Sequence, residues 1–297
     1  MFFHETKQSW HPDRWAYAFT LPAALLMFLT LLLPIVIVIA MSFTDYALGS
    51  TEFSWVGLKN YQELVFNDTF LRSLKNTLLY VLIVVPSAVI IGLVLAILVE
   101  NAKWGRKAYR IIFFMPVAST LVAMAIVWKY LLHDSIGPVN LFLRALGFQG
   151  AAFFSDPDWV MFSLGIVGIW QLAGFNMVLF MSALCSIPSE VNDAATIDGA
   201  DGFWRRLFTV TLPLISPTML FVVTTSSITA FKLFDSVAVL THGGPQGASD
   251  VLLYSAYTEG FANLNTAGAS AMTGVFLIMI VMGSWIQARI SEKKVHY

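Results

Sequence analysis

Long uncharged runs of apolar residues alternate with short polar connections along the chain. A helix needs about 20 apolar residues to cross the hydrocarbon core of a bilayer, because every backbone polar group must be satisfied within the segment. Runs of this length predict six transmembrane helices, at about residues 15–41, 76–99, 109–132, 159–187, 209–238 and 263–288. The first run is too long for the core of a signal peptide, so we expect it to be retained. The pattern predicts an all-α, polytopic integral membrane protein with one membrane domain over residues 15–290.

The composition supports the same class. Charged residues make up 12% of the 297 residues and hydrophobic residues 58%, whereas a soluble domain carries about 25% charged residues. The single cysteine, Cys185, excludes a disulfide within the chain and a cysteine-based zinc site, and we expect it to be a small buried hydrophobe. The five histidines are scattered through tails and loops, so the sequence predicts no catalytic residues and no metal site.

Lysine and arginine residues are divided unequally between the two sides of the predicted membrane domain. With a cytoplasmic N-terminus, most of them fall in inner segments, at Lys7, Arg14, Lys103, Arg106, Lys107, Arg110, Arg205, Arg206, Arg289, Lys293 and Lys294. The outer segments hold Lys59, Arg72, Lys75 and Arg144. Because inner loops carry the excess of positive charge, we predict that the tails 1–14 and 291–297 and the loop 189–210 are all cytoplasmic.

The connection between the fourth and fifth apolar runs is polar, acidic and rich in small residues. Glu190 and Asp193 place acidic side chains near the start of a short helix, where the helix dipole favours them. Gly199 fits the left-handed turn that ends a helix, and a second amphipathic stretch runs from there to Pro213. We therefore predict a helix, a glycine turn and a helix at the membrane surface. The plain alternative is an interfacial elbow anchored by Trp204.

This segment resembles the EAA signature of ABC importer permeases, which has Glu-Ala-Ala, then a glycine, then Leu-Pro before the next span. The matching positions are Asp193, Ala194 and Ala195, then Asp198, Gly199 and Ala200, and finally Leu212 and Pro213. Aspartate stands where the signature usually has glutamate, and a contact that needs the longer side chain would be weakened. In this family the signature forms a coupling helix that fits a groove on a cytoplasmic ATPase, so the resemblance implies an ATPase partner for the segment.

Further stretches resemble the carbohydrate-type permeases of maltose, multiple-sugar and glycerol-3-phosphate importers. They are VGLKNYQEL followed by NTLLY, then WQLAGFNMVLFMSALCSIP in the fourth run, and FDSVAVLTHGGP after the fifth. Together the similar regions cover most of the chain from Trp55 to Phe261. The chain is thus identified as a member of the type I ABC importer permeases, multi-pass proteins of the bacterial or archaeal plasma membrane.

The resemblance implies a heteromeric complex that imports a sugar or sugar-like polyol by alternating access through the lipid bilayer. Its other members would be a second, related permease, two ATPase subunits and an external solute-binding protein, with no nucleic acid involved. ATP and magnesium would be bound by the ATPase subunits and no cofactor by this chain, which has no Gly-Lys dipeptide and hence no phosphate-binding loop. The chain itself is therefore expected to be non-catalytic. The implied ATPase-coupling residues are Glu190, Asp193, Ala194, Ala195, Asp198, Gly199, Ala200 and Pro213.

Two groups of polar residues inside the runs are candidates for the solute pathway. Gln171 and Asn176 are amides flanked by Trp170 and Phe175, a combination that suits sugar hydroxyls and sugar rings. Hydrogen bonding between helices is the alternative for these amides. Lys232 and Asp235 lie three residues apart near the outer end of the fifth run, where they would share a helical face.

The alternatives for this second group are that Lys232 and Asp235 pair with each other, or that one of them faces the solute. A cation there would suit a phosphate-bearing or acidic sugar. The sequence leaves open whether the solute is neutral oligosaccharide, glycerol-3-phosphate or an acidic sugar.

Two other transport classes fit the sequence less well. An ion-coupled secondary carrier would show inverted repeats and buried carboxylates, and the interiors of the six runs lack Asp and Glu except near their ends. A channel would show a recognisable polar filter, and the sequence contains none.

Overall fold

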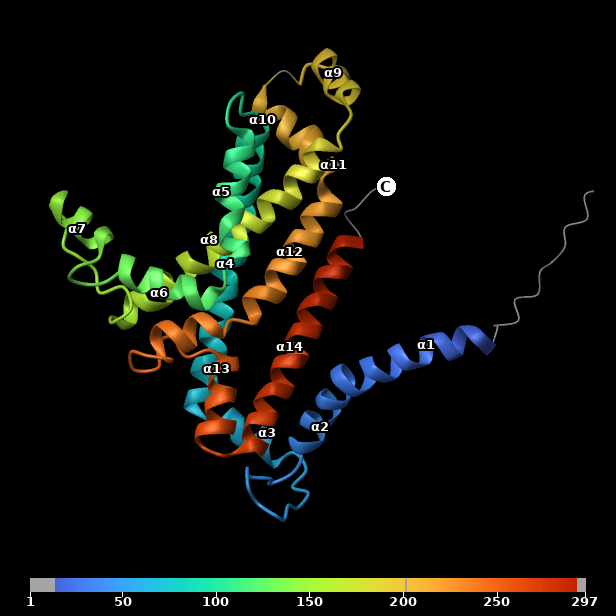
Figure 1. The fold of residues 1–297 in the computed structure, drawn as a ribbon, viewed down its shortest axis with the longest axis vertical. Helices are drawn as coiled ribbons and strands as arrows, with labels where there is room; N and C mark the ends of the chain where they lie inside the picture. The colour runs from blue at the N-terminus through green and yellow to red at the C-terminus, as the bar shows by residue number, and fades with distance from the viewer. Residues whose placement is uncertain (1–13, 201, 293–297) are drawn as a thin grey trace, which may run out of the picture.

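The computed structural model describes residues 14–200 and 202–292, which form an all-helical bundle (Figure 1). The predicted all-α class is confirmed, since these residues hold helices and one isolated antiparallel bridge between Thr44 and Trp55. The predicted tails at 1–14 and 291–297 lie almost entirely outside the described residues.

Four unbroken helical segments are long and apolar enough to cross a membrane. They are Phe19–Met41, Asp68–Glu100, Pro157–Cys185 and Thr266–Gln287. The first comprises most of α1 (Arg14–Met27), with η1 (Phe28–Leu32) and α2 (Leu33–Met41), and the others belong to α4 (Asp68–Glu100), α8 (Pro157–Cys185) and α14 (Thr266–Glu292). They correspond to the first, second, fourth and sixth predicted spans.

The third and fifth predicted spans are bent. The helices α5 (Arg106–Ala118) and α6 (Leu121–Leu131) meet at 104°, and the segments Phe203–Leu214 and Ser216–Phe231 meet at 75°. The described residues therefore hold six spans only if each bent pair counts as one. The second pair comprises α10 (Phe203–Arg206), η2 (Leu207–Thr211), α11 (Leu212–Leu214) and α12 (Ser216–Phe231). Pro213 and Pro217 flank its bend, as expected because proline donates no backbone hydrogen bond.

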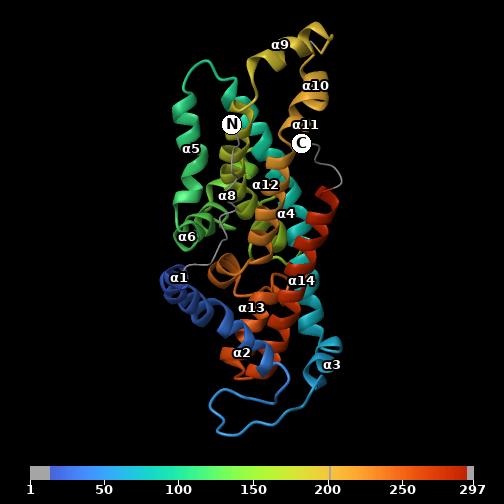
Figure 2. The same ribbon diagram turned by 90° about the vertical axis from the view of Figure 1, so that its right-hand side faces the viewer.

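The remaining helices are short. They are α3 (Lys59–Val65), α7 (Pro138–Ala145), α9 (Ser189–Ile197), η3 (Val237–Thr241), α13 (Leu252–Tyr257) and η4 (Thr258–Ala262). The helix α9 lies at the end where α4 finishes and α5 begins, and α3 lies at the opposite end (Figures 1 and 2). We name these the α9 end and the α3 end.

Basic side chains gather at the α9 end. The α4–α5 connection and α10 lie at this end, and the C-terminal part of α14 runs toward it (Figure 2). These segments carry Lys103, Arg106, Lys107, Arg110, Arg205, Arg206 and Arg289. The fold thus brings together the basic residues that the sequence assigns to one side of the membrane.

The core forms where α4 and α8 approach closely. A Cβ on Gly168 would lie 2.0 Å from the hydroxyl oxygen of Tyr80, and one on Gly92 would lie 2.6 Å from the Cβ of Asn176. Small residues at such crossings let helices pack in a membrane, where lipid is as apolar as the side chains. The helix α2 packs against α14, whereas α1 leans away from the bundle (Figure 1). The cytoplasmic location of the N-terminus stays a prediction.

Candidate functional site

The predicted glycine turn lies at the α9 end, between α9 and α10. Gly199 has a φ of +81°, in the left-handed region. The N–H of Ala200 donates to the carbonyl of Ala195 at 2.8 Å, and the N–H of Gly199 donates to that of Thr196 at 3.1 Å. This pair of bonds is the Schellman motif, which satisfies the last carbonyls of a helix. Residues 189–206, named here the α9–α10 hairpin, therefore have the helix, turn and helix expected from the sequence.

Two arginines of α10 fasten the turn to the second helix. Arg205 donates from Nη1 to the carbonyl of Gly199 at 3.0 Å, and Arg206 donates from Nη2 to Oγ1 of Thr196 at 2.9 Å. The sequence indicated only that these residues are basic and lie on the inner side. Their role in holding α9 was missed, because it depends on how the chain turns back at Gly199.

The implied coupling residues of the hairpin are not all exposed. Most of the implied coupling residues are exposed, namely Glu190, Asp193, Ala194, Asp198, Gly199 and Pro213. Ala195 and Ala200 are instead buried, at 8% and 7% exposure, because they form the inner side of the turn. Ile197 is 86% exposed, so a large aliphatic side chain stands on the outer surface beside Ala194. Sequence reasoning did not single out Ile197.

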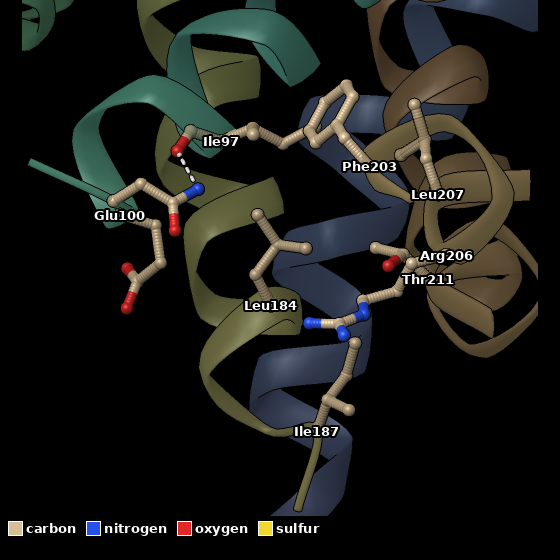
Figure 3. Close-up of a pocket in the computed structure, with 9 residues that line it drawn as sticks. Ile97, Glu100, Leu184, Ile187, Phe203, Arg206, Leu207 and Thr211 are labelled. Atoms are coloured by element: carbon tan, nitrogen blue, oxygen red, sulfur yellow. Dashed lines mark hydrogen bonds between the residues drawn. The ribbon is translucent and has the colours of Figure 1, made fainter. Parts of the chain in front are cut away.

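Beneath the hairpin lies a cavity of about 480 Å³ (Figure 3). It is lined by Ile97, Glu100, Asn101, Leu184, Ile187, Phe203, Arg206, Leu207 and Thr211. In Figure 3 the side chain of Arg206 extends from α10 toward Leu184 and Ile187. The cavity separates α10 and η2 from the ends of α4 and α8, so the hairpin is not packed tightly on the bundle.

An ion pair between Arg106 and Glu100 joins the start of α5 to the end of α4. The Cys185 thiol, at the end of α8, donates to Oε2 of Glu100 at 3.4 Å. The expectation of a buried, hydrophobic Cys185 is wrong, since its side chain is exposed and contacts this ion pair. The three helix ends are thus linked beside the cavity.

A second cavity, of about 280 Å³, lies where α12 ends and α6 begins. Of the candidate pathway residues, Gln171, Lys232 and Asp235 line it together. Its other polar lining residues are Tyr80, Thr229 and Ser236, which sequence reasoning missed. Hydroxyl-bearing residues are common in apolar helices, and no local pattern distinguishes these three from the rest.

The expectation that Lys232 and Asp235 share a helical face is wrong. The helix α12 ends at Phe231, and Lys232 is its C-cap, so the two residues lie on either side of a break. They form no ion pair with each other, and both are exposed. The alternative in which they merely neutralise each other within a helix therefore does not describe this fold.

The remaining pathway candidates lie outside this lining. Trp170 makes an edge-to-face contact with Trp128, at a centroid distance of 5.5 Å, and Phe175 is half-buried. Asn176 is fully buried and accepts a hydrogen bond from the Ser226 hydroxyl at 3.1 Å, between α8 and α12. Its position in the helix interface matches the alternative of hydrogen bonding between helices.

The α3 end carries a third polar cavity, of about 360 Å³, lined by residues that include His242, Asp250 and Glu259. Burial raises the pKa of Asp250 above its usual range, and the charge of Arg72 opposes that change. Nearby, hydrogen bonds from the hydroxyl and N–H of Ser54 hold the pKa of Asp45 below its usual range. The two carboxyl groups thus differ in how readily they ionise: Asp45 stays ionised to lower pH than Asp250.

Comparison with known proteins supports the same reading of the chain. Over 266 residues it is 31% identical to a probable ABC transporter permease protein of Pyrococcus horikoshii, covering 89% of this chain and 91% of the relative. It is 33% identical over 251 residues to the sn-glycerol-3-phosphate transport system permease protein UgpA of Yersinia enterocolitica, covering 84% and 83%.

The fold is shared with a solved structure. A chain of a bacterial ABC transporter involved in the import of the acidic polysaccharide alginate superposes with a TM-score of 0.84 at 23% identity, covering 96% of this chain and 97% of the other. Residues 88–296 match the family described as the inner membrane component of binding-protein-dependent transport systems. With its apolar helices and this match over most of its length, the chain belongs to that family and is a multi-pass permease protein of an ABC transporter.

Proposed function

We propose that this chain is the permease subunit of an ATP-driven importer for a sugar or sugar-like polyol, which it moves by alternating access. The observation that carries the proposal is the α9–α10 hairpin, with its left-handed Gly199 and exposed Ile197 at the basic end of the bundle. The excess of positive charge at that end favours a cytoplasmic location for it. The α3 end then faces outward, toward a solute-binding protein.

In this proposal the hairpin docks on an ATPase subunit, which binds and hydrolyses magnesium-ATP. Ile197 supplies an apolar anchor, since a large aliphatic side chain in water gains free energy when a partner covers it. Ala194 permits close approach, and Glu190, Asp193 and Asp198 form a polar rim around the anchor. Arg205 and Arg206 hold the turn in place when the ATPase moves the hairpin. A second permease and a second ATPase subunit complete the complex.

The solute is proposed to pass the cavity at the end of α12. Gln171 and the Tyr80 hydroxyl suit hydrogen bonding to sugar hydroxyls, and Lys232 suits a phosphate or carboxylate group. The name of the Yersinia relative refers to glycerol 3-phosphate and that of the structural neighbour to an acidic polysaccharide, and both of these solutes are anionic. We therefore favour an anionic sugar or polyol, with specificity shared with the binding protein.

The test is the substitution Ile197→Asp in the assembled importer. Placing a charge at the centre of the interface should reduce copurification of the ATPase and ATP-driven uptake at least tenfold, because an unpaired charge is costly to desolvate. Ile136→Asp is the matched control, since Ile136 is also exposed but follows α6, outside the hairpin. Equal copurification and uptake for the two variants would remove the hairpin from the ATPase interface.

A further inference from the structure

An apolar groove of about 400 Å³ runs along α5 at the edge of the bundle. Its lining residues are Arg110, Ile111, Phe114, Met115 and Ala118 of α5 and Val178 of α8. In both views α5 stands on the flank of the bundle, with its first turn at the α9 end (Figures 1 and 2). Arg110 is therefore the groove residue nearest that end, and the rest of the lining is apolar.

The walls of the groove are held at a fixed separation. A Cβ on Gly174 of α8 would lie 2.0 Å from the carbonyl oxygen of Phe113 in α5, so the two backbones are in direct contact there. At the end of the groove, the Arg106–Glu100 ion pair holds the first turn of α5 against α4. The shape of the groove is thus fixed by the close packing of α5 against α8.

Arg110 lines the groove, Lys107 lies in the first turn of α5 and Lys103 just before it, and none of the three has a carboxylate partner among the described residues. Among the described residues the ion pairs are Lys59–Glu63 and Arg106–Glu100, which leaves Lys103, Lys107 and Arg110 exposed and unneutralised. Lys107 precedes Ile111 by one helical turn, so it lies on the same face of α5 as the groove. The cations and the apolar surface therefore form one continuous strip.

Exposed aromatic residues lie within the charged part, next to its cations. Trp104 is 88% exposed and Tyr109 is 46% exposed, on either side of the start of α5. Tryptophan and tyrosine favour the depth of lipid headgroups, where one part of the ring system is apolar and the other is hydrated. Their position places Lys103 and Lys107 at headgroup depth, with the groove extending into the hydrocarbon.

We propose that this groove is a binding site for an anionic phospholipid. The phosphate lies among Lys103, Lys107 and Arg110, and an acyl chain lies along Ile111, Phe114 and Ala118. A packed helix would cover the apolar wall but would leave three cations unneutralised, whereas an anionic lipid satisfies both parts of the strip. A sugar suits the site poorly, because the groove offers it almost no hydrogen-bonding groups.

The test measures lipids retained by the complete importer, purified in mild detergent and mixed with equal amounts of phosphatidylglycerol and phosphatidylcholine. Native mass spectrometry should show preferential retention of phosphatidylglycerol by the unaltered protein. The combined change Lys103→Gln, Lys107→Gln and Arg110→Gln should lower that preference at least tenfold, since each cation near an anionic surface contributes about fivefold. Changing Lys59, Lys75 and Lys129 to Gln removes the same charge elsewhere and should leave the preference unchanged.

A second variant tests the apolar wall without changing charge. Ala118→Phe fills the groove and should reduce retention of phosphatidylglycerol, whereas Ala123→Phe on α6 should not. Equal preference in the unaltered protein and the triple glutamine variant would overturn the proposal. So would unchanged lipid retention together with loss of the second permease subunit, because that subunit would then be the occupant of the groove.

Discussion

At the scale of single residues, Gly199 shows that backbone conformation, not space, decides which side chain is possible in the hairpin. The nearest atom to a Cβ built on Gly199 is Nη1 of Arg205, at 4.0 Å, so a Cβ would clash with no neighbouring atom. The φ of +81° is nevertheless costly for a residue with a β-branched side chain. The turn and its Schellman hydrogen bonds depend on this conformation.

Replacing Gly199 by valine should therefore distort the turn, at a cost of about 1 kcal/mol or more. We expect ATP-driven uptake to fall severely while the amount of chain inserted in the membrane stays unchanged. Asparagine tolerates the left-handed region better than valine, so Gly199→Asn should keep most of the uptake. Full uptake by the valine variant would mean that the turn is not a coupling element.

The local sequence predicts some features of the hairpin and not others. Gly199 was predictable because helix-ending turns have their own chemistry, and the polar character of the hairpin follows from composition. The burial of Ala195, the exposure of Ile197 and the contact between Cys185 and Glu100 depend on how distant segments meet. The spacing of residues in the sequence does not predict such contacts between distant segments.

At the scale of elements, the packing of α8 on α4 is set by glycines of unequal importance. A Cβ on Gly168 would overlap the Tyr80 hydroxyl oxygen at 2.0 Å, whereas one on Gly165 would lie 3.7 Å from Val84. The first position requires glycine, and the second has room for alanine.

Gly168→Ala should thus lower stability by about 1–3 kcal/mol through overpacking, while Gly165→Ala should be nearly neutral. A thermal unfolding midpoint in detergent, followed by tryptophan fluorescence, distinguishes the two. Adding Tyr80→Phe to the Gly168→Ala variant removes the overlapping oxygen and should restore part of the loss. Equal midpoints for the two alanine variants would show that the helices are farther apart than described.

Helix breaks are the part of the element structure that apolar runs do not reveal. The four unbroken spans follow from length and composition, but the bends in the third and fifth runs interrupt stretches that are also long and apolar enough to cross a membrane. Prolines near both bends hinted at breaks without fixing their positions. The end of α12 at Phe231 has no such signal, which is why Lys232 and Asp235 were expected to share a face.

Lys232→Met tests the function proposed for that break. If Lys232 contacts an anionic solute, the variant should lose at least about tenfold in uptake, since removing one charged hydrogen bond costs about 1.5–3 kcal/mol. Assembly with the partner subunits should be unchanged. Lys129→Met removes an exposed lysine from α6 and is the control. Uptake by Lys232→Met equal to that of the control would remove Lys232 from the pathway.

At the scale of the whole molecule, one stretch of chain links the two candidate sites. Residues 203–231 run from the hairpin through the 75° bend to the cavity at the end of α12. Ile215, at the bend, is 1% exposed and packed in the core. The open cavity beneath α10 leaves the hairpin end of this stretch room to move. A displacement of the hairpin can therefore reach Lys232 along one stretch of chain, through the bend whose Ile215 is held in the core.

The division of charge between the two ends was predictable from the sequence, because the fold keeps each basic segment on its side. The position of α1 and α2 beside the bundle was not, since an apolar run alone does not tell which neighbours cover it. In the proposed function, solute therefore enters at the α3 end, and ATP acts at the α9 end.

Uptake into proteoliposomes tests that claim most directly. The importer is reconstituted with magnesium-ATP on the side of the α9 end, and with binding protein and radiolabelled solute on the side of the α3 end. Solute should accumulate against its gradient only when ATP and binding protein are both present on these sides. Accumulation driven by an ion gradient without ATP would contradict the account and identify a secondary carrier instead.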